Sequence, residues 1–443
     1  MRDLEALRTL ERLPLDELIE GQRRPGRAEM DPAFLAHWTE QYHRAVELAT
    51  DPRSSRATRS LAQLLKDLTF PLIAQQEDPI PEYYPYTGVH HLEWYLENRH
   101  QSWDRLKARA AEGIFHTLVD FIRFESQSLA GLEPWHRENF HREDVTQRIH
   151  VLERAVEKCH ELGRLIPEAS MDRNRTARRY DALGEYAAEP SRVSAMVEFS
   201  MMPQTRFHDE VLFLRIIHIS EFCFFGIRVA VREARELLVN GLVHAAVIPL
   251  RQALAFGAML YESFKVMRTM TPERFLDFRA ATGKASAIKS LNYQLLEIHL
   301  RGVNADKLEV IRRIPHLRPL SKFAHTGFRP LRKVLRQADP AAPGWDDVLE
   351  AARALDQKWL TWRGLHLSFA ILYLPPEGPG TGDTAGAPYL RKFLKAGLFD
   401  DTEVDMELVK ELFGDHPEIP NLFRARPNEA FAPVEELRAY RES

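Results

Sequence analysis

The sequence predicts an all-α protein, and three observations lead to that prediction. Apolar residues recur at spacings of three and four along most of the chain, which is the period of an amphipathic helix. Alternating patterns rich in β-branched residues, which are typical of strands, are almost absent. The chain has 443 residues, 44% of them hydrophobic and 28% charged, which is the composition of a globular protein with a sizeable core.

Charge and cysteine content exclude several classes of protein. Sixty Lys and Arg residues against 64 Asp and Glu residues give a net charge of −4, so composition offers no argument for a nucleic-acid partner. The two cysteines, Cys159 and Cys223, are too few for a disulfide framework or a zinc ribbon. We therefore expect a protein of the reducing cytoplasm.

Neither export nor a membrane span is expected. Residues 1–13 mix charged residues with leucines in the pattern of an amphipathic helix, unlike a signal peptide. The most apolar stretch, residues 211–231, contains Arg215, His218, Glu221 and Arg228, which a lipid-facing helix would not carry. This stretch is therefore predicted to be a buried helix.

The remaining elements follow in order along the chain. Prolines at 71, 79, 81 and 85 should end one helix and start an extended connection. A weakly periodic stretch at 166–191 indicates a boundary between a helical N-terminal region, 1–175, and a second domain, 176–443. Thr205, followed by acids in the first turn, predicts the start of a long helix to about Leu238. Further helices are expected near 241–268, 272–302, 346–373 and 404–413.

Three features of the second domain suggest chemistry. His366 lies four residues after Trp362 in an apolar helix, which suits either a satisfied core histidine or a haem-iron ligand. Arg279 follows an apolar helix start, where a guanidinium pairs with a nearby acid or with a bound carboxylate. The glycine-rich stretch 378–386 has no strand before it and no Lys after it, so it is either a surface loop or a loop that closes on a ligand.

Three separated stretches of the second domain resemble signatures of the tryptophan 2,3-dioxygenase family, in the family's order. The first is HDEVLFLRIIHISE at 208–221. The second is TPERFLDFR at 271–279 with ASAIKSLNYQLLE at 285–297. The third is WRGLH at 362–366 with GTGDTAGAPYLR at 380–391. The resemblance covers roughly residues 180–400, and it implies a helical haem-binding core to which residues 1–175 add a further helical region.

The resemblance also implies roles for individual residues. His366 would be the proximal ligand of haem b iron, and Ser286 and Trp362 would contact the haem. Arg279 would bind the substrate carboxylate, and Thr381 would contact its ammonium or carboxylate group. Phe213, Phe275 and Ile217 would line the pocket for the aromatic ring.

One position departs from the family's pattern. In the ungapped match the family's distal histidine falls on Ile217, and His218 is the next residue. One residue turns a helical side chain by about 100°, so His218 reaches the haem only if a bulge near Arg215 restores its register. We therefore retain His218 as a candidate distal base.

The function implied is a haem-dependent oxygenase that uses O2 to oxidise an aromatic amino acid, with L-tryptophan or a derivative as the best single substrate. Conversion of L-tryptophan would give N-formylkynurenine. The alternatives are a monooxygenase that hydroxylates tyrosine or a tryptophan derivative, and a non-catalytic haem-binding protein. The resemblance also implies a homo-oligomer, either a dimer or a tetramer.

Overall fold

The computed structural model confirms the all-α prediction. It describes residues 2–23, 26–77, 82–96, 101–133, 135–175, 181–188, 193–325, 327–374 and 390–413. Within these ranges the only extended pairings are two isolated bridges, Pro14 with Ala182 and Glu138 with Phe207. No helix in the same ranges is both long enough and apolar enough to cross a membrane.

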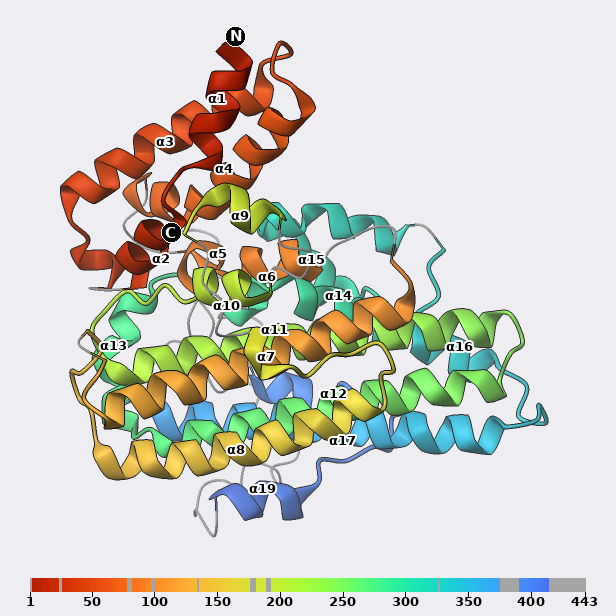
Figure 1. Ribbon diagram of the computed structural model, residues 1–443. Coiled ribbons are helices and arrows are strands. Elements are labelled where there is room, and N and C mark those ends of the chain that lie inside the picture. The colour runs from red at the N-terminus through yellow and green to blue at the C-terminus, as the bar shows by residue number, and fades with distance from the viewer. Residues whose placement is uncertain are drawn as a thin grey trace, which may run out of the picture.

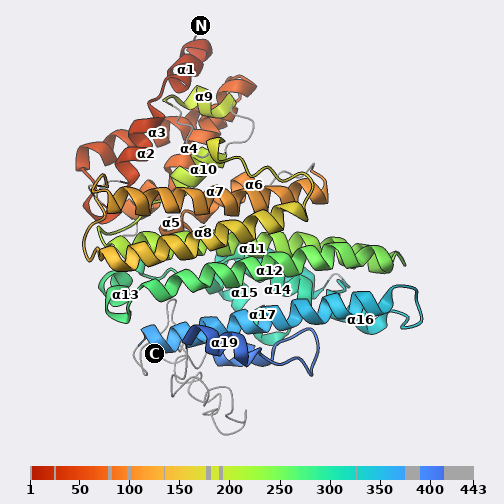
Figure 2. The same cartoon turned by 60° about the horizontal axis from the view of Figure 1, so that its bottom comes forward.

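The main body is a bundle of long helices that run side by side (Figures 1 and 2). These helices are α7 (Trp103–Leu129), α8 (Arg142–Arg164), α11 (His208–Val239), α12 (Val247–Lys265) and α17 (Trp345–Tyr373). Helix α11 lies at the centre and is buried from His208 to Val231 except at two positions, as its apolar sequence predicts. The candidate histidine and the first family-like stretch therefore lie on neighbouring helices of one core.

Two glycines allow the central helices to approach closely. A Cβ atom on Gly113 of α7 would lie 2.4 Å from the ring of Phe222 on α11. A Cβ atom on Gly226 of α11 would lie 2.5 Å from the ring of Phe256 on α12. Both distances are below any real contact, so these helix crossings require glycine.

The segment between α12 and α17 forms shorter helices beside the bundle. These are α13 (Pro272–Arg279), α14 (Leu291–Arg301), α15 (Ala305–Arg313) and α16 (Leu331–Gln337). The prediction of one helix over 272–302 is wrong, because the chain turns at Gly283, whose φ of 54° only glycine adopts readily. The break separates α13, which carries Arg279, from α14.

The N-terminal helices build a second hydrophobic core above the bundle in Figure 1. It is formed by α1 (Arg2–Glu11), α2 (Leu15–Arg23), α3 (Pro32–Thr50), α4 (Arg56–Glu77) and α9 (Leu183–Ala188). Contrary to the expectation from its prolines, α4 continues through Pro71 to Glu77. Pro85 lies in the short helix α5 (Tyr83–Thr87), which precedes α6 (Val89–Leu96), and Pro79 and Pro81 lie outside the described residues.

The two cores do not divide the chain at residue 175. Helices α7 and α8 precede that position, yet their apolar residues pack in the main core with α11 and α12. Conversely, α9 lies after it and packs on the N-terminal helices. Sequence periodicity locates a break between helices but does not show which core each helix joins, and this is why the expected boundary and the packing differ.

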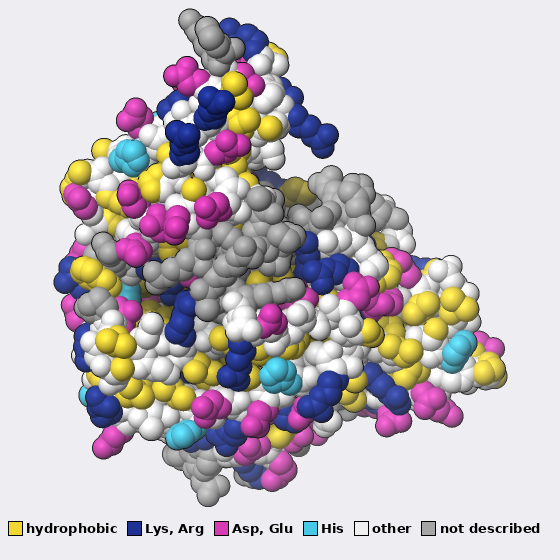
Figure 3. All heavy atoms as spheres, in the orientation of Figure 1, with side chains coloured by type: hydrophobic (Ala, Val, Ile, Leu, Met, Phe, Trp, Pro, Cys, Tyr) yellow, Lys and Arg dark blue, Asp and Glu magenta, His cyan; other side chains and the backbone are white. Residues whose placement is uncertain are grey.

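The remaining described helices are α10 (Val193–Ser200) and α19 (Met406–Phe413). Asp356 of α17 binds the chain before α19, accepting the amides of Leu398 at 2.6 Å and Phe399 at 3.0 Å. On the face of the molecule in Figure 3, basic and acidic side chains are interspersed, which agrees with the near-neutral composition.

Candidate active site

His366 lies near the middle of α17 in a setting that suits a metal ligand. Its ring stacks on Trp362, with centroids 5.7 Å apart, and the ring of Phe264 on α12 approaches it edge-on at 6.1 Å. The residue is only half-buried, although its neighbours on α17 are buried. Burial of the ring lowers the pKa of His366 to about 4, so the imidazole is neutral, which is the form that binds a metal.

Helix α17 is held in register by a buried ion pair one residue after Trp362. Arg363 pairs with Glu297 of α14 and donates to the carbonyls of Phe393 at 3.0 Å and Ala396 at 2.8 Å. Glu297 also accepts the indole N–H of Trp359 at 3.1 Å. These contacts fix the rotation of α17 and therefore the face on which His366 lies.

Residues around His366 fit a haem group. The indole Nε1–H of Trp362 is buried and has no hydrogen-bond acceptor among the described residues. No described residue forms a hydrogen bond with either ring nitrogen of His366. A haem has an iron atom, which a neutral imidazole can bind, and acceptor groups, which can take the indole N–H. The surrounding aromatic rings suit its apolar macrocycle.

A wall of aromatic rings connects His366 with the first and second family-like stretches. From Phe264 the ring contacts run through Phe369 at 6.2 Å to Tyr373 at 5.7 Å, both on α17. Tyr373 contacts Phe275 of α13 at 5.3 Å, and Phe275 contacts Phe213 of α11 at 5.7 Å. The structure therefore brings Phe213 and Phe275 together at one end of a wall that has His366 at the other.

Arg279 lies at the Phe275 end of this wall. Its guanidinium carbon is 5.9 Å from the centre of the Phe275 ring, and the two residues are four apart on one face of α13. Half-burial lowers the pKa of Arg279, which still leaves the guanidinium charged at neutral pH. The nearby acid Asp277 accepts a hydrogen bond from Asn139.

Ile217 and His218 lie on different sides of α11. Ile217 shares a face with Phe213, and both are half-buried on the part of the helix, residues 208–231, that is otherwise buried. His218 is fully buried, and its Nε2 lies 2.6 Å from the carbonyl oxygen of Thr87, the last residue of α5. Its Nδ1 faces Arg215 at 3.4 Å, so the structure brings Ile217, and not His218, to the face that carries Phe213.

The other two candidate positions are less informative. Ser286 lies in the turn between α13 and α14, where it is buried and its carbonyl accepts the amide of Lys289 at 2.9 Å. Thr381 lies outside the described residues.

Sequence reasoning missed Phe264, Phe369 and Tyr373, which complete the aromatic wall. Tyr373 is seven residues after His366, so helical spacing alone places the two on one face and was the available signal. Phe264 belongs to a different helix, and nothing in its local sequence distinguishes it from a core residue.

Comparison with known proteins shows which family a part of the chain resembles. Residues 171–316 match the family model described as "Tryptophan 2,3-dioxygenase". A tryptophan 2,3-dioxygenase of Ruegeria pomeroyi is 27% identical over 235 residues, covering 45% of this chain and 84% of the relative. Another, of Myxococcus xanthus, is 25% identical over 260 residues, covering 49% of this chain and 86% of the relative. Residues 171–316 of this chain thus resemble the tryptophan 2,3-dioxygenase family, and these two relatives, at 25–27% identity, are oxidoreductases.

Proposed function

We propose that this protein is a haem b-dependent oxygenase that uses O2 to oxidise an aromatic amino acid, with L-tryptophan or a derivative as the first substrate to test. The observation that carries the proposal is the aromatic wall, which has an imidazole at one end and a guanidinium at the other. A cofactor site and a carboxylate site separated by apolar rings are what such a reaction requires.

Each residue has a distinct part in this proposal. The neutral imidazole of His366 holds the iron, and Trp362 and Ser286 contact the cofactor. Arg279 binds the substrate carboxylate through two charge-assisted hydrogen bonds. Phe213, Phe275 and Ile217 enclose the aromatic ring and exclude water, and Thr381 contacts the ammonium or carboxylate group. Haem bound on His366 supplies the redox chemistry that activates O2.

Ile217 favours a second candidate reaction. An aliphatic side chain cannot accept a proton, and His218 is bonded to Thr87 on another side of α11. Catalysis then depends on orienting the substrate in a dry site and on the cofactor itself. Transfer of a single oxygen atom, which would hydroxylate tyrosine or a tryptophan derivative, is the alternative reaction that such a site supports.

Mass spectrometry of the product made under ¹⁸O2 tests both reactions. The haem-loaded, reduced protein is incubated with L-tryptophan, L-tyrosine and ring-substituted tryptophans. Two heavy oxygen atoms in N-formylkynurenine identify a dioxygenase, and one heavy atom in a hydroxylated amino acid identifies a monooxygenase. Absence of any oxidised product from a haem-loaded protein contradicts the proposal and supports a non-catalytic haem protein.

Location and assembly complete the proposal. Both cysteines, Cys159 and Cys223, are free and buried, as suits a protein of the reducing cytoplasm. We further propose a homo-oligomer, either a dimer or a tetramer, on the basis of the family resemblance.

A further inference from the structure

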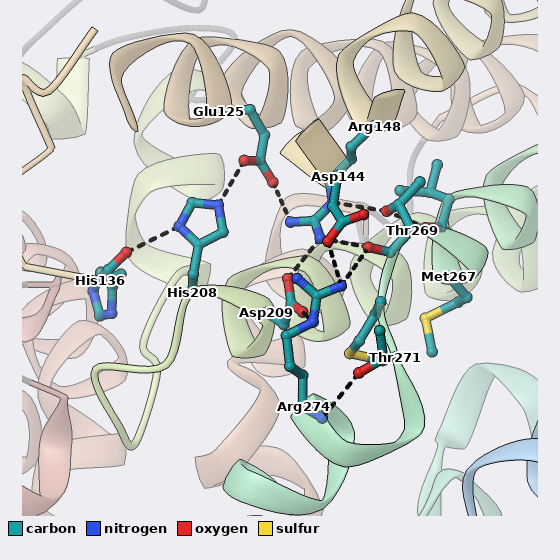
Figure 4. A network of polar contacts seen from close by, with 12 residues as sticks. Glu125, His136, Asp144, Arg148, His208, Asp209, Met267, Thr269, Thr271 and Arg274 are labelled. Carbon is teal, nitrogen blue, oxygen red and sulfur yellow. Dashed lines mark hydrogen bonds and ion pairs between the residues drawn. The ribbon is translucent and has the colours of Figure 1, made fainter. Parts of the chain in front are cut away.

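The family-like stretch that begins with His208 and Asp209 takes part in a buried network of charged groups outside the aromatic wall (Figure 4). We call it the Asp209 network. Its members come from α7, α8, α11, α13 and the turn that precedes α13, and they are Glu125, Asp144, Arg148, His208, Asp209, Thr269 and Arg274. None of these groups has a part in the proposed chemistry, and all except Asp144 are buried, so their burial needs another explanation.

Arg148 is the centre of the network and is fully buried. Its guanidinium donates to Glu125 at 2.7 Å, to Asp209 at 2.6 Å and to the hydroxyl of Thr269 at 2.9 Å. Burial opposes the charge of Glu125, but Arg148 and His208 outweigh it and lower the pKa of this carboxyl. Glu125 is therefore ionised, and α7, α8 and α11 are joined by charge-assisted hydrogen bonds.

His208 connects the network to the segment between α7 and α8. Its Nδ1 lies 2.9 Å from the carbonyl oxygen of His136, and its Nε2 lies 2.7 Å from a carboxylate oxygen of Glu125. The ring of His208 therefore joins the carboxylate of Glu125 to the backbone at His136.

Arg274 extends the network to α13. Its Nε lies 3.2 Å from Asp209, and its terminal nitrogen contacts Asp144 at 2.9 Å and the carbonyl of Thr269 at 3.1 Å. The residue is 6% exposed. Asp209 therefore bridges two arginines, one on α8 and one on α13, and connects the start of α11 to both.

Arg274 and Arg279 lie on different faces of α13. Phe275 and Arg279, four residues apart, share the face toward the aromatic wall, and Arg274 is turned from Phe275 by about 100° toward Asp209. Only eight residues long, α13 gains little stability from its own backbone, so its position depends on tertiary contacts. Thr271 caps it, and Tyr373 of α17 donates to the carbonyl oxygens of Met267 and Met270 just before it.

We propose that Asp209 and Arg274 are positioning residues, which fix α13 so that Arg279 meets the carboxylate of the substrate. This inference rests on the proposed function of Arg279. Asp209 then contributes to substrate binding without contacting the substrate, because it holds the helix that carries the guanidinium of Arg279. Loss of Arg274 leaves Arg279 in the chain but allows α13 to move.

Steady-state kinetics of Arg274→Gln test the proposal. We expect the Michaelis constant for the amino acid to rise about tenfold with a kcat within about threefold of the wild type, and an unchanged constant for the decarboxylated amine. Both arginines act through the contact of Arg279 with the substrate carboxylate. In a double-mutant cycle, Arg279→Ala should therefore raise the Michaelis constant of Arg274→Gln only slightly further. Arg274→Lys keeps the charge but not the planar array of donors, so its Michaelis constant should lie between those of the wild type and Arg274→Gln.

Arg123→Gln is the matched control. Arg123 of α7 also pairs with two acids, Asp120 and Glu198, but it makes no contact with α13. The proposal is overturned if Arg123→Gln and Arg274→Gln both raise the Michaelis constants for acid and amine equally. It is also overturned if the changes in free energy caused by Arg274→Gln and Arg279→Ala add fully, since Arg274 is then only a structural residue.

Hydrogen exchange separates this proposal from the proposed function. In Arg274→Gln the amides of α13 should exchange at least about tenfold faster than in the wild type, while those of α14 stay protected. Arg274→Lys, the milder variant, should show a smaller acceleration at the same amides. Unchanged exchange in α13 in both variants refutes the positioning role even if the protein oxidises amino acids. If the amides of α13 exchange faster in Arg274→Gln but the protein oxidises no amino acid, the positioning role of Arg274 is supported and only the proposed function is contradicted.

Discussion

At the scale of single residues, Arg279 and His366 carry most of the functional argument. Their apolar neighbours made both residues candidates, and the family resemblance implied their roles. The structure connects them through the rings of Phe264, Phe369, Tyr373 and Phe275. The connection itself could not be predicted, because three of the rings come from sequence positions that look like ordinary core residues.

The side of α11 on which His218 lies also needed the structure. Sequence alone left a one-residue bulge open, which would have turned His218 toward Phe213. The helix is regular through this point, and His218 is bonded to Thr87, more than a hundred residues earlier in the chain. A contact of that sequence separation leaves no local signal.

Arg279→Ala should weaken the binding of an amino-acid substrate selectively. A carboxylate that loses a charge-assisted, two-bond partner in a desolvated site loses about 1.5–3 kcal/mol or more, so the Michaelis constant should rise at least about tenfold. Steady-state kinetics with the amino acid and its decarboxylated amine give the measurement. The amine has no carboxylate to pair with the guanidinium, so its Michaelis constant should not change. An equal rise for both compounds would show that Arg279 has a structural role.

At the scale of helices, close packing and buried ion pairs hold the bundle together. Long helices such as α11 and α17 were predicted well, because a buried helix of this length has a strong periodic pattern. The split between α13 and α14 was missed, since a single glycine such as Gly283 within a helical pattern does not by itself predict the end of a helix. The Asp209 network was missed as well, because Glu125 and Arg148 come from distant parts of the chain.

Gly226→Ala should destabilise the protein, and Gly257→Ala should not. A methyl group on Gly226 meets the ring of Phe256, which is fully buried and cannot move aside, and overpacking of this kind costs about 1–3 kcal/mol. At Gly257 the nearest atom is Cγ of Lys358, 3.3 Å away on a flexible side chain. Alanine there gains up to about 1 kcal/mol in helix propensity. Urea unfolding followed by circular dichroism measures both, and equal stabilities would contradict the proposed crossing of α11 and α12.

Asp120 of α7 should make the stability dependent on acid pH. Burial opposes its ionisation, but Arg215 of α11 with Arg23 and Arg123 outweighs burial and lowers the pKa of Asp120 from 3.8 to about 2. A carboxyl group with a lowered pKa stabilises the fold fully at a pH above its pKa in the unfolded chain. This contribution is lost as the pH falls through the pKa in the folded protein. The shift corresponds to about 2 kcal/mol, about half of which is lost by pH 3.

The free energy of unfolding of Asp120→Asn at pH 6 and at pH 3 measures this contribution. Its deficit relative to the wild type should narrow by about 1 kcal/mol between the two values. Glu157→Gln, at an exposed position of α8, is the control and should show no such change. A deficit that stays constant with pH would mean that Asp120 contributes through packing alone.

At the scale of the whole molecule, two hydrophobic cores share one chain. The N-terminal helices form their own core, while α7 and α8 complete the core that holds the aromatic wall. The matched family region begins at residue 171, so the helices that precede it both support the main bundle and add a separate layer above it.

Light scattering coupled to size-exclusion chromatography should show a dimer or a tetramer. Apolar side chains remain exposed at the turn between α11 and α12, where Val239, Leu242 and Ile248 are 45%, 48% and 65% accessible in the single chain. Burial of such residues favours association. A particle of 51.2 kDa at micromolar concentration, the mass of one chain, would contradict the proposed assembly.

The central claim is that His366 holds haem, and the Soret absorbance of three haem-titrated proteins tests it most directly. The wild type and the control His150→Ala, whose side chain is 71% exposed on α8, should each bind about one haem per chain. His366→Ala should keep the helical circular-dichroism spectrum and lose the Soret band, since no other described histidine ends the aromatic wall. A His366→Ala variant that retains the band at the wild-type position and intensity would contradict the claim.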